Sequence, residues 1–136
     1  MKPVLPLVAL ALASPAAVAG PMQADRYFAL RTVGAAADIP DFVVRISETA
    51  RARAFSRALK DGRPMRLASR IVQRPAAWNA AWPFYTERHA LIPLDRLVSR
   101  CPSHTPATQA ARVQGHARLQ GSAWCPAVVV VREIRP

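Results

Sequence analysis

Aromatic side chains gather between Pro75 and Tyr85, and these residues have the plainest capacity for binding chemistry in the chain. The stretch reads P-A-A-W-N-A-A-W-P-F-Y, so two tryptophans, a phenylalanine and a tyrosine fall within eight residues. Tryptophan and tyrosine combine a large apolar ring with a polar group that is usually hydrogen-bonded when buried. Two interpretations follow. Either the rings plug one end of the core, with Asn79 bonding backbone groups in a turn, or they form a binding surface, whose candidate residues are Trp78, Asn79, Trp82, Phe84 and Tyr85.

A second candidate for binding is the pair Arg132 and Glu133, near the end of the chain. If 127–134 forms a strand, the two side chains point to opposite faces of the sheet. A buried charge needs a partner. The pair therefore predicts either a structural salt bridge from one of the many arginines or a contribution to the binding site.

The tripeptide Glu87-Arg88-His89 could supply an acid, an anion contact and a base. It stands in a stretch that we predict to be a polar loop, where exposed side chains are expected. The sequence has no glycine-rich phosphate loop, no G-x-S-x-G, no H-E-x-x-H and no calcium loop. Its eight carboxylates include no pair that spacing alone places across a cleft. We therefore name no catalytic residue, and a small secreted hydrolase stays as an alternative.

The first residues have the pattern of a secretory signal peptide. Met1 and Lys2 form a short basic start, Val4 to Ala13 is apolar, and Ala17-Val18-Ala19 gives an A-x-A cleavage site. The apolar run is too short to span a bilayer, although an N-terminal membrane anchor is the alternative interpretation. We predict a signal peptide over 1–19 and one exported domain over 20–136, secreted or periplasmic, with no integral membrane segment after cleavage.

Cys101 and Cys125 are the two cysteines of the chain. In an oxidising compartment, an even count of cysteines predicts a disulfide bond. The alternatives are a reactive thiol or a metal pair with His104 and His116. The spacing Cys-x2-His-x11-His-x8-Cys matches no zinc pattern. We predict a disulfide, no metal site and no cofactor.

The composition is apolar enough for a folded domain and strongly basic. Apolar residues make up 51% of the chain, which excludes a disordered polar chain. Lys+Arg number 19 against 8 Asp+Glu, a formal net charge of +11. Removal of Lys2 with the signal peptide leaves 18 basic residues against 8 acidic ones, and 17 of the 18 are arginine. Such a charge favours anionic partners, but the arginines are spread along the chain instead of forming blocks.

Hydrophobic alternation predicts an initial β-hairpin and a helix. Strands are expected over 27–33 and 42–46, joined by a turn over 34–40. Ser47 is a suitable N-cap for a helix over 48–60, which would end at Asp61-Gly62.

The second half of the chain is predicted to complete the sheet. The spacing indicates strands over 66–74 and 94–101, a short extended piece over 90–93, and a helix over 107–119 with Thr105 as its N-cap. The apolar β-branched run at 127–134 is typical of a strand that is buried on both faces in the middle of a sheet. The order predicts an α+β two-layer sandwich: a mostly antiparallel sheet of about four or five strands, one or two helices and one disulfide.

The chain resembles a family of small secreted single-disulfide α+β domains of uncharacterised function, found alone or at the N-terminus of larger proteins. The resemblance covers about 110 residues and is carried by Ala52-Arg53, by Trp78-Asn79-Ala80-Ala81-Trp82-Pro83-Phe84, by Trp124-Cys125-Pro126 and by Val131-Arg132-Glu133-Ile134. Cys101 stands where the family has its other cysteine. The chain departs from the family at Tyr85 (often His), Pro102 (acidic) and Ala127 (aromatic). The resemblance implies the fold and the disulfide, and it supplies no reaction.

These features together favour an exported, non-catalytic binding module for an unknown protein or small-molecule ligand. The alternative is arginine-driven binding to an anionic polymer or a membrane surface.

Overall fold

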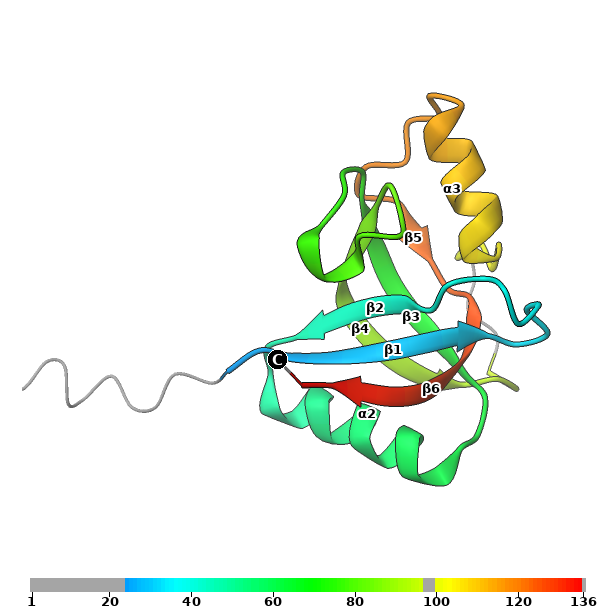
Figure 1. Ribbon diagram of the computed structural model, residues 1–136. Coiled ribbons are helices and arrows are strands. Elements are labelled where there is room, and N and C mark those ends of the chain that lie inside the picture. Colours follow the sequence, from blue (N-terminus) through cyan, green and yellow to red (C-terminus); the bar gives the residue numbers. More distant parts are fainter. Residues whose placement is uncertain (1–23, 97–99, 136) are drawn as a thin grey trace, which may run out of the picture.

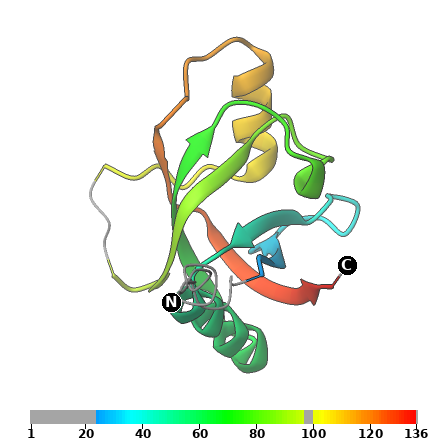
Figure 2. The same ribbon diagram turned by 90° about the vertical axis from the view of Figure 1, so that its left-hand side faces the viewer.

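The computed structural model describes residues 24–96 and 100–135, so the predicted signal peptide lies outside the described residues. Six strands form one antiparallel sheet in the order β2-β1-β6-β3-β4, with the short β5 paired to β3. Two helices, α2 and α3, lie at opposite ends of the sheet (Figures 1 and 2). The predicted α+β class with one disulfide is confirmed.

The predicted hairpin is formed by β1 (Arg26–Thr32) and β2 (Phe42–Ile46). Alternate residues of β2 are buried, as a strand with one face on the core requires. Phe28 and Val44 are partners in the register and are both fully buried. The outward-facing positions of β2, Val43 and Arg45, are therefore available to a second layer of contacts.

Helix α2 (Thr49–Asp61) follows the hairpin and packs on the sheet through Ala52, Phe55 and Ala58. Its N-cap is Glu48, not Ser47 as predicted, and the Glu48 side chain makes no capping bond. The Ser47 hydroxyl donates to Asp25 at 2.8 Å instead, so it is not available as a cap. The helix ends as predicted at Gly62, whose φ of 68° is the left-handed conformation that glycine adopts without a Cβ penalty.

Strand β3 (Met65–Val72) is followed by a 3₁₀ turn, η1 (Ala77–Asn79), and by strand β4 (Tyr85–Pro93). The predicted polar loop at 87–89 is wrong, because these residues lie inside β4. Two residues of β4, Arg88 and His89, oppose the single residue Ser69 of β3, which is a β-bulge. The extra residue interrupts the alternation by which a strand is recognised.

After β4 the chain turns at 94–96, so the predicted strand over 94–101 is wrong for its described residues; 97–99 lie outside them. The predicted disulfide joins Cys101 to Cys125, with the Cα atoms 5.6 Å apart. Helix α3 (Pro106–Gln114) starts as predicted, with Thr105 Oγ1 accepting a hydrogen bond from the Thr108 N–H at 3.2 Å. It ends at Gly115 and is shorter than predicted.

Strands β5 (Ala123–Trp124) and β6 (Ala127–Ile134) complete the sheet. β6 lies between β1 and β3, so its predicted place in the middle of the sheet is confirmed. The prediction that both of its faces are buried is wrong: Val128 and Val130 are buried, whereas Val129 and Val131 are half-buried. Helix α2 packs against this strand.

The sheet curves strongly, and its two edge strands approach each other. β2 and β4 stand at opposite ends of the strand order, yet the two strands are in contact. The start of α2 lies next to both. The curvature therefore brings the end of β2, the beginning of α2 and the first half of β4 to one place.

Candidate functional site

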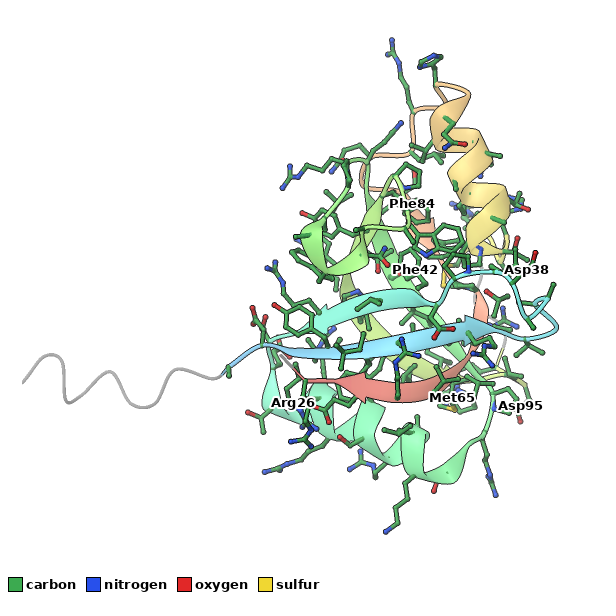
Figure 3. The ribbon with its side chains drawn as sticks, viewed as in Figure 1. Arg26, Asp38, Phe42, Met65, Phe84 and Asp95 are labelled. Carbon is green, nitrogen blue, oxygen red and sulfur yellow. A yellow bond between two sulfur atoms is a disulfide. The ribbon has the colours of Figure 1, made fainter. Side chains whose placement is uncertain are left out.

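Three of the five aromatic-segment candidates belong to the core. Phe84 is fully buried, and Asn79 and Trp82 are 2% and 6% exposed. Phe84 and Phe42 lie close together (Figure 3), and their ring centres are 5.2 Å apart. Trp124 packs edge-on against both rings. Because these side chains are enclosed, they plug one end of the core and cannot contribute to a binding surface.

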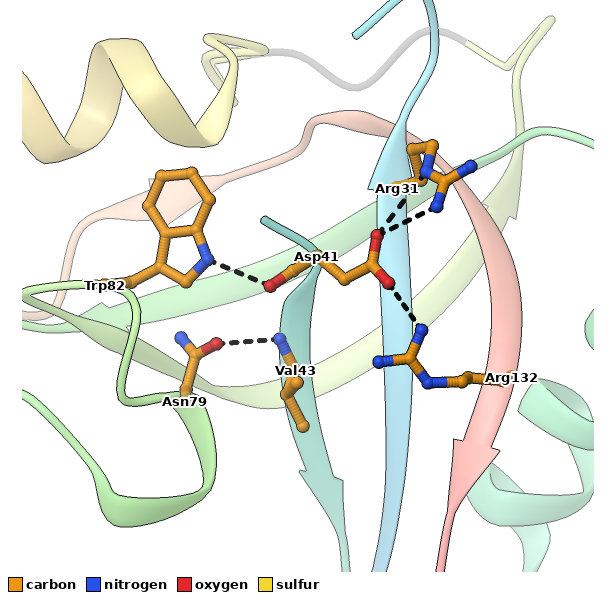
Figure 4. A network of polar contacts seen from close by, with 6 residues as sticks. All are labelled: Arg31, Asp41, Val43, Asn79, Trp82 and Arg132. Atoms are coloured by element: carbon orange, nitrogen blue, oxygen red, sulfur yellow. Dashed lines mark hydrogen bonds and ion pairs between the residues drawn. The ribbon is translucent and has the colours of Figure 1, made fainter. Parts of the chain in front are cut away.

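Asn79 holds the aromatic segment to strand β2. Its Oδ1 accepts a hydrogen bond from the Val43 N–H at 2.8 Å, and its Nδ2 donates to the Phe84 carbonyl at 3.1 Å. The Trp82 indole N–H donates to the Asp41 carbonyl at 3.0 Å (Figure 4). The segment thus satisfies backbone groups of a strand edge that would otherwise be unpaired.

Arg132 and Glu133 both take part in structural ion pairs. Arg132 donates to Asp41 Oδ2 at 2.8 Å, and Arg31 approaches the other oxygen of Asp41 at 3.4 Å (Figure 4). Glu133 accepts two hydrogen bonds of 2.8 Å from Arg26. These hydrogen bonds lower the pKa of the Glu133 carboxyl and raise the pKa of Arg26. The predicted structural salt bridge from another arginine is confirmed.

Trp78 and Tyr85, the remaining candidates, are half-buried and lie against each other. Their rings meet edge to face with centroids 5.1 Å apart, and Tyr27 of β1 approaches Trp78 at 6.2 Å. The Arg45 guanidinium lies 4.0 Å from the centre of the Trp78 ring, in a cation–π contact. Arg74 donates to the Tyr85 hydroxyl at 3.0 Å. These contacts form an aromatic cluster of Tyr27, Trp78 and Tyr85 with an arginine stacked on it.

The aromatic cluster borders a cleft between β2, the start of α2 and β4. Its volume is about 260 Å³. The walls come from two stretches that are far apart in sequence, 45–51 and 78–89, and the lining residues are Arg45, Ile46, Ser47, Glu48, Arg51, Trp78, Tyr85, Thr86, Glu87, Arg88 and His89. Among the described residues, Trp78 Nε1 is the one buried side-chain polar atom without a hydrogen-bond partner.

The charged side chains that line the cleft differ in how many hydrogen bonds and ion pairs they make within the protein. Arg51 is committed: it donates to Glu48 Oε2 at 2.9 Å and to the His89 carbonyl. Arg45 approaches Asp25 through its Nε at 3.9 Å, which is beyond hydrogen-bond distance. The described residues provide no hydrogen bond or ion pair to the Arg88 or Glu87 side chain.

The β-bulge of β4 forms one wall of the cleft. Arg88 has a φ of 57°, a left-handed conformation that is strained for a residue with a side chain. His89 is buried, and burial lowers its pKa to about 4, so the ring is neutral above that pH. Its Nε2 lies 2.9 Å from the Thr86 hydroxyl.

Thr86 and His89 are close enough to resemble a nucleophile and its base, but their surroundings do not suit catalysis. Both side chains are buried, at 4% exposed each. A general base works best when its pKa is near the working pH, which a pKa of about 4 is not. In 24–96 and 100–135, no group of three or more metal-ligating side chains is brought together.

The sequence did not reveal that three functional candidates, Arg45, Arg51 and Arg88, line one cleft. Alternation along β2 places Arg45 on the outward face, but it gives no sign that Trp78 lies beneath it. The tripeptide Glu87-Arg88-His89 was singled out from its residue types, yet it was assigned to a loop. The curvature that joins β2 to β4 has no local signal in the sequence.

Comparisons with known proteins find no relative of this chain. Among the described residues, none of the helices is both long and apolar enough to cross a membrane. The resemblance to secreted single-disulfide domains stays a prediction. No family model, no curated protein and no solved structure matches the chain.

Proposed function

We propose that the protein is an exported, non-catalytic binding module that holds its ligand in the cleft between β2 and β4. The observation that carries the proposal is the Arg45 guanidinium stacked at 4.0 Å on Trp78, at the wall of a cleft of about 260 Å³. Aromatic walls with a few convergent polar groups are typical of ligand sites. The Cys101–Cys125 disulfide is compatible with an oxidising compartment outside the cytoplasm.

The arrangement of the arginines supports this proposal over binding to an anionic polymer. Many arginines are used within the molecule: Arg66 donates to the Cys125 carbonyl and Arg70 to the Gly121 carbonyl. Arg26, Arg31 and Arg132 are paired with carboxylates. A polyanion surface requires an array of free cations, and these arginines instead tie segments together.

The proposal also takes precedence over a secreted hydrolase. The described side chains that most resemble a catalytic pair, Thr86 and His89, are buried, and His89 is a weak base. A ligand in the cleft would meet Trp78, Tyr85 and arginine side chains, which bind and orient but do not activate water. The carboxylates of the lining, Glu48 and Glu87, are both exposed, and Glu48 is paired with Arg51.

The test is a survey by NMR that uses the indole N–H resonances of the oxidised ¹⁵N-labelled protein. Compounds are chosen in equal numbers from acidic, basic and neutral classes, and a sulfated polymer is added as a polyanion probe. Trp78 lines the cleft, whereas Trp82 and Trp124 donate to backbone carbonyls inside the fold and serve as internal controls. A ligand of the cleft is expected to shift the Trp78 resonance and leave the other two in place.

A variant pair completes the test. Binding in the variants is followed by the backbone amide resonances of the ¹⁵N-labelled protein. Trp78→Leu should abolish binding of any compound that shifts the Trp78 resonance of the unsubstituted protein, whereas Leu94→Ser, at an exposed position outside the cleft, should leave binding unchanged. Binding that persists in Trp78→Leu contradicts the proposal. Binding to the sulfated polymer alone, lost steeply as salt rises, would support the arginine-driven alternative instead.

A further inference from the structure

We propose that the cleft binds a small organic anion, a carboxylate or a phosphate, through the guanidinium of Arg45, and that Asp25 is an internal competitor for that guanidinium. This inference rests on the proposed function and names the chemistry of its ligand.

Arg45 is held in place before any ligand arrives. The Cζ atom of its guanidinium lies over the Trp78 ring, 4.0 Å from the ring centre. The indole is itself fixed by Tyr85 at 5.1 Å and by Tyr27 at 6.2 Å. A guanidinium stacked on a ring still presents its N–H groups at its edge, where a carboxylate or phosphate can accept two hydrogen bonds. Such pre-positioning lowers the entropy cost of binding.

The donors around Arg45 are not matched by acceptors of the protein. The Asp25 carboxylate lies 3.9 Å from Arg45 Nε and accepts a 2.8 Å hydrogen bond from Ser47 instead. Trp78 Nε1 also has no hydrogen-bond partner among the described residues, but this atom is buried, so the donors that a ligand can reach are those of Arg45. These unpaired N–H donors favour a ligand that brings hydrogen-bond acceptors, and an anion brings the strongest acceptors.

Further positive groups border the same cleft. Arg88 enters from β4, and within the described part of the chain it has no ion-pair partner. Its strained φ of 57° is retained where β4 forms the wall. The N-cap of α2, Glu48, places a carboxylate at the positive end of the helix dipole and is paired with Arg51 at 2.9 Å. Glu48 and Glu87 are the opposing charges in the lining, and they favour a ligand with a single anionic group over a polyanion.

The size of the cleft limits the ligand to a compact molecule. A volume of about 260 Å³ accommodates an anionic group joined to one small ring or chain, and it is too small for a folded partner. The Tyr85 ring offers an apolar wall for such a body. Asp25 does not line the cleft but lies 3.9 Å from Arg45, so its carboxylate repels an incoming anion.

The experiment compares benzoate, phenyl phosphate and benzamide as probes of the oxidised protein, followed at the Trp78 indole N–H and the Arg45 Nε–H resonances. Benzoate and benzamide have the same ring but differ in charge. We expect one or both anions to bind at least tenfold more tightly than benzamide, since a charge-assisted pair is about twice as strong as a neutral one. The tighter of the two anions identifies the ligand as a carboxylate or a phosphate.

Three variants locate the effect. Arg45→Gln should weaken anion binding about tenfold or more, and Arg45→Lys should weaken it less, because lysine keeps the charge and loses the fork. Asp25→Asn should tighten anion binding about threefold or more, since it removes the competing carboxylate. Arg53→Gln is the matched control: it makes the same charge change at an exposed position of α2 outside the cleft, and less than twofold change is expected.

The outcomes separate the two proposals. Equal binding of benzamide and benzoate, unaffected by Arg45→Gln, overturns the anion inference and leaves the binding site in place. Unchanged or weaker anion binding in Asp25→Asn overturns the inference that Asp25 competes with the ligand for the Arg45 guanidinium. If no probe and no compound of the wider survey shifts the Trp78 resonance, both proposals fall. A thermal unfolding curve for each variant confirms that the fold is intact.

Discussion

At the scale of single residues, His89 shows how a titratable side chain is accommodated in this small core. Its ring packs edge-on against Phe55, with centroids 6.4 Å apart, and its Nε2 meets the Thr86 hydroxyl. Burial disfavours the charged ring, and the nearby positive charges of Arg51 and Arg45 add to the effect, so the pKa falls to about 4. In the unfolded chain the pKa of this histidine is about 6.5. As the pH falls, the unfolded chain therefore binds the proton before the folded protein does.

The folded protein should therefore lose stability as the pH falls from about 6.5 towards 4. Because the folded pKa is below the unfolded one, the full contribution is present above pH 6.5 and is lost progressively below it. The total loss is about 3 kcal/mol, at 1.36 kcal/mol for each pKa unit. Urea unfolding at a series of pH values from 7.5 to 5 measures the slope, and His89→Gln should flatten it.

Glu133 provides the control for the loss of stability between about pH 6.5 and pH 4. The hydrogen bonds from Arg26 lower the pKa of its carboxyl, so its contribution to stability is present above the unfolded value and is lost only as the pH falls below about 4.5. Glu133→Gln should lower stability at every pH above 5 without altering the slope between pH 6.5 and 5. A slope that persists in His89→Gln would assign it to another group.

At the scale of elements, the turn η1 is fastened to the edge of β2 by one side chain. Asn79→Ala leaves the Val43 N–H and the Phe84 carbonyl without partners in a buried place. An unsatisfied buried group costs about 1–3 kcal/mol, so we expect a loss of about 2–4 kcal/mol in the free energy of unfolding. Denaturant unfolding measures it, with the exposed neighbour Ala80→Ser as the control. A loss below about 1 kcal/mol would show that water replaces both bonds.

The elements that the sequence predicts well are those with an unbroken period or a local signal. Strand β2 buries alternate residues, and α2 and α3 end at glycines. The extended piece predicted over 90–93 is the end of β4, but the first half of the strand is not predicted, because the bulge at Arg88–His89 shifts the alternation by one residue. The aromatic segment was found from its residue types. Its division into core and cleft depends on Phe42 and Trp124, which lie far away in the sequence, so no local pattern predicts it.

At the scale of the whole molecule, several arginines tie the strands of the curved sheet and helix α2 to one another. Asp41 precedes β2, and two arginines from β1 and β6 hold its carboxylate. Arg26 of β1 links Glu133 of β6 to Ser56 of α2. These ties join the edge strand and the helix to the sheet, while β2 and β4 close on the cleft. Surface ion pairs contribute little free energy individually, so their role is to fix the geometry of the segments.

The disulfide acts on stability at a distance from the cleft. It joins Cys101 to Cys125, which are separated by 24 positions, and the cysteines are absent from the cleft lining. In the chain-entropy model, opening such a loop lowers the free energy of unfolding by about 3 kcal/mol. The double variant Cys101→Ser, Cys125→Ser should show this loss by urea unfolding and still give the Trp78 resonance of the native cleft at low temperature. A shifted Trp78 resonance in the folded variant would show instead that the loop from β4 to β5 positions the binding site.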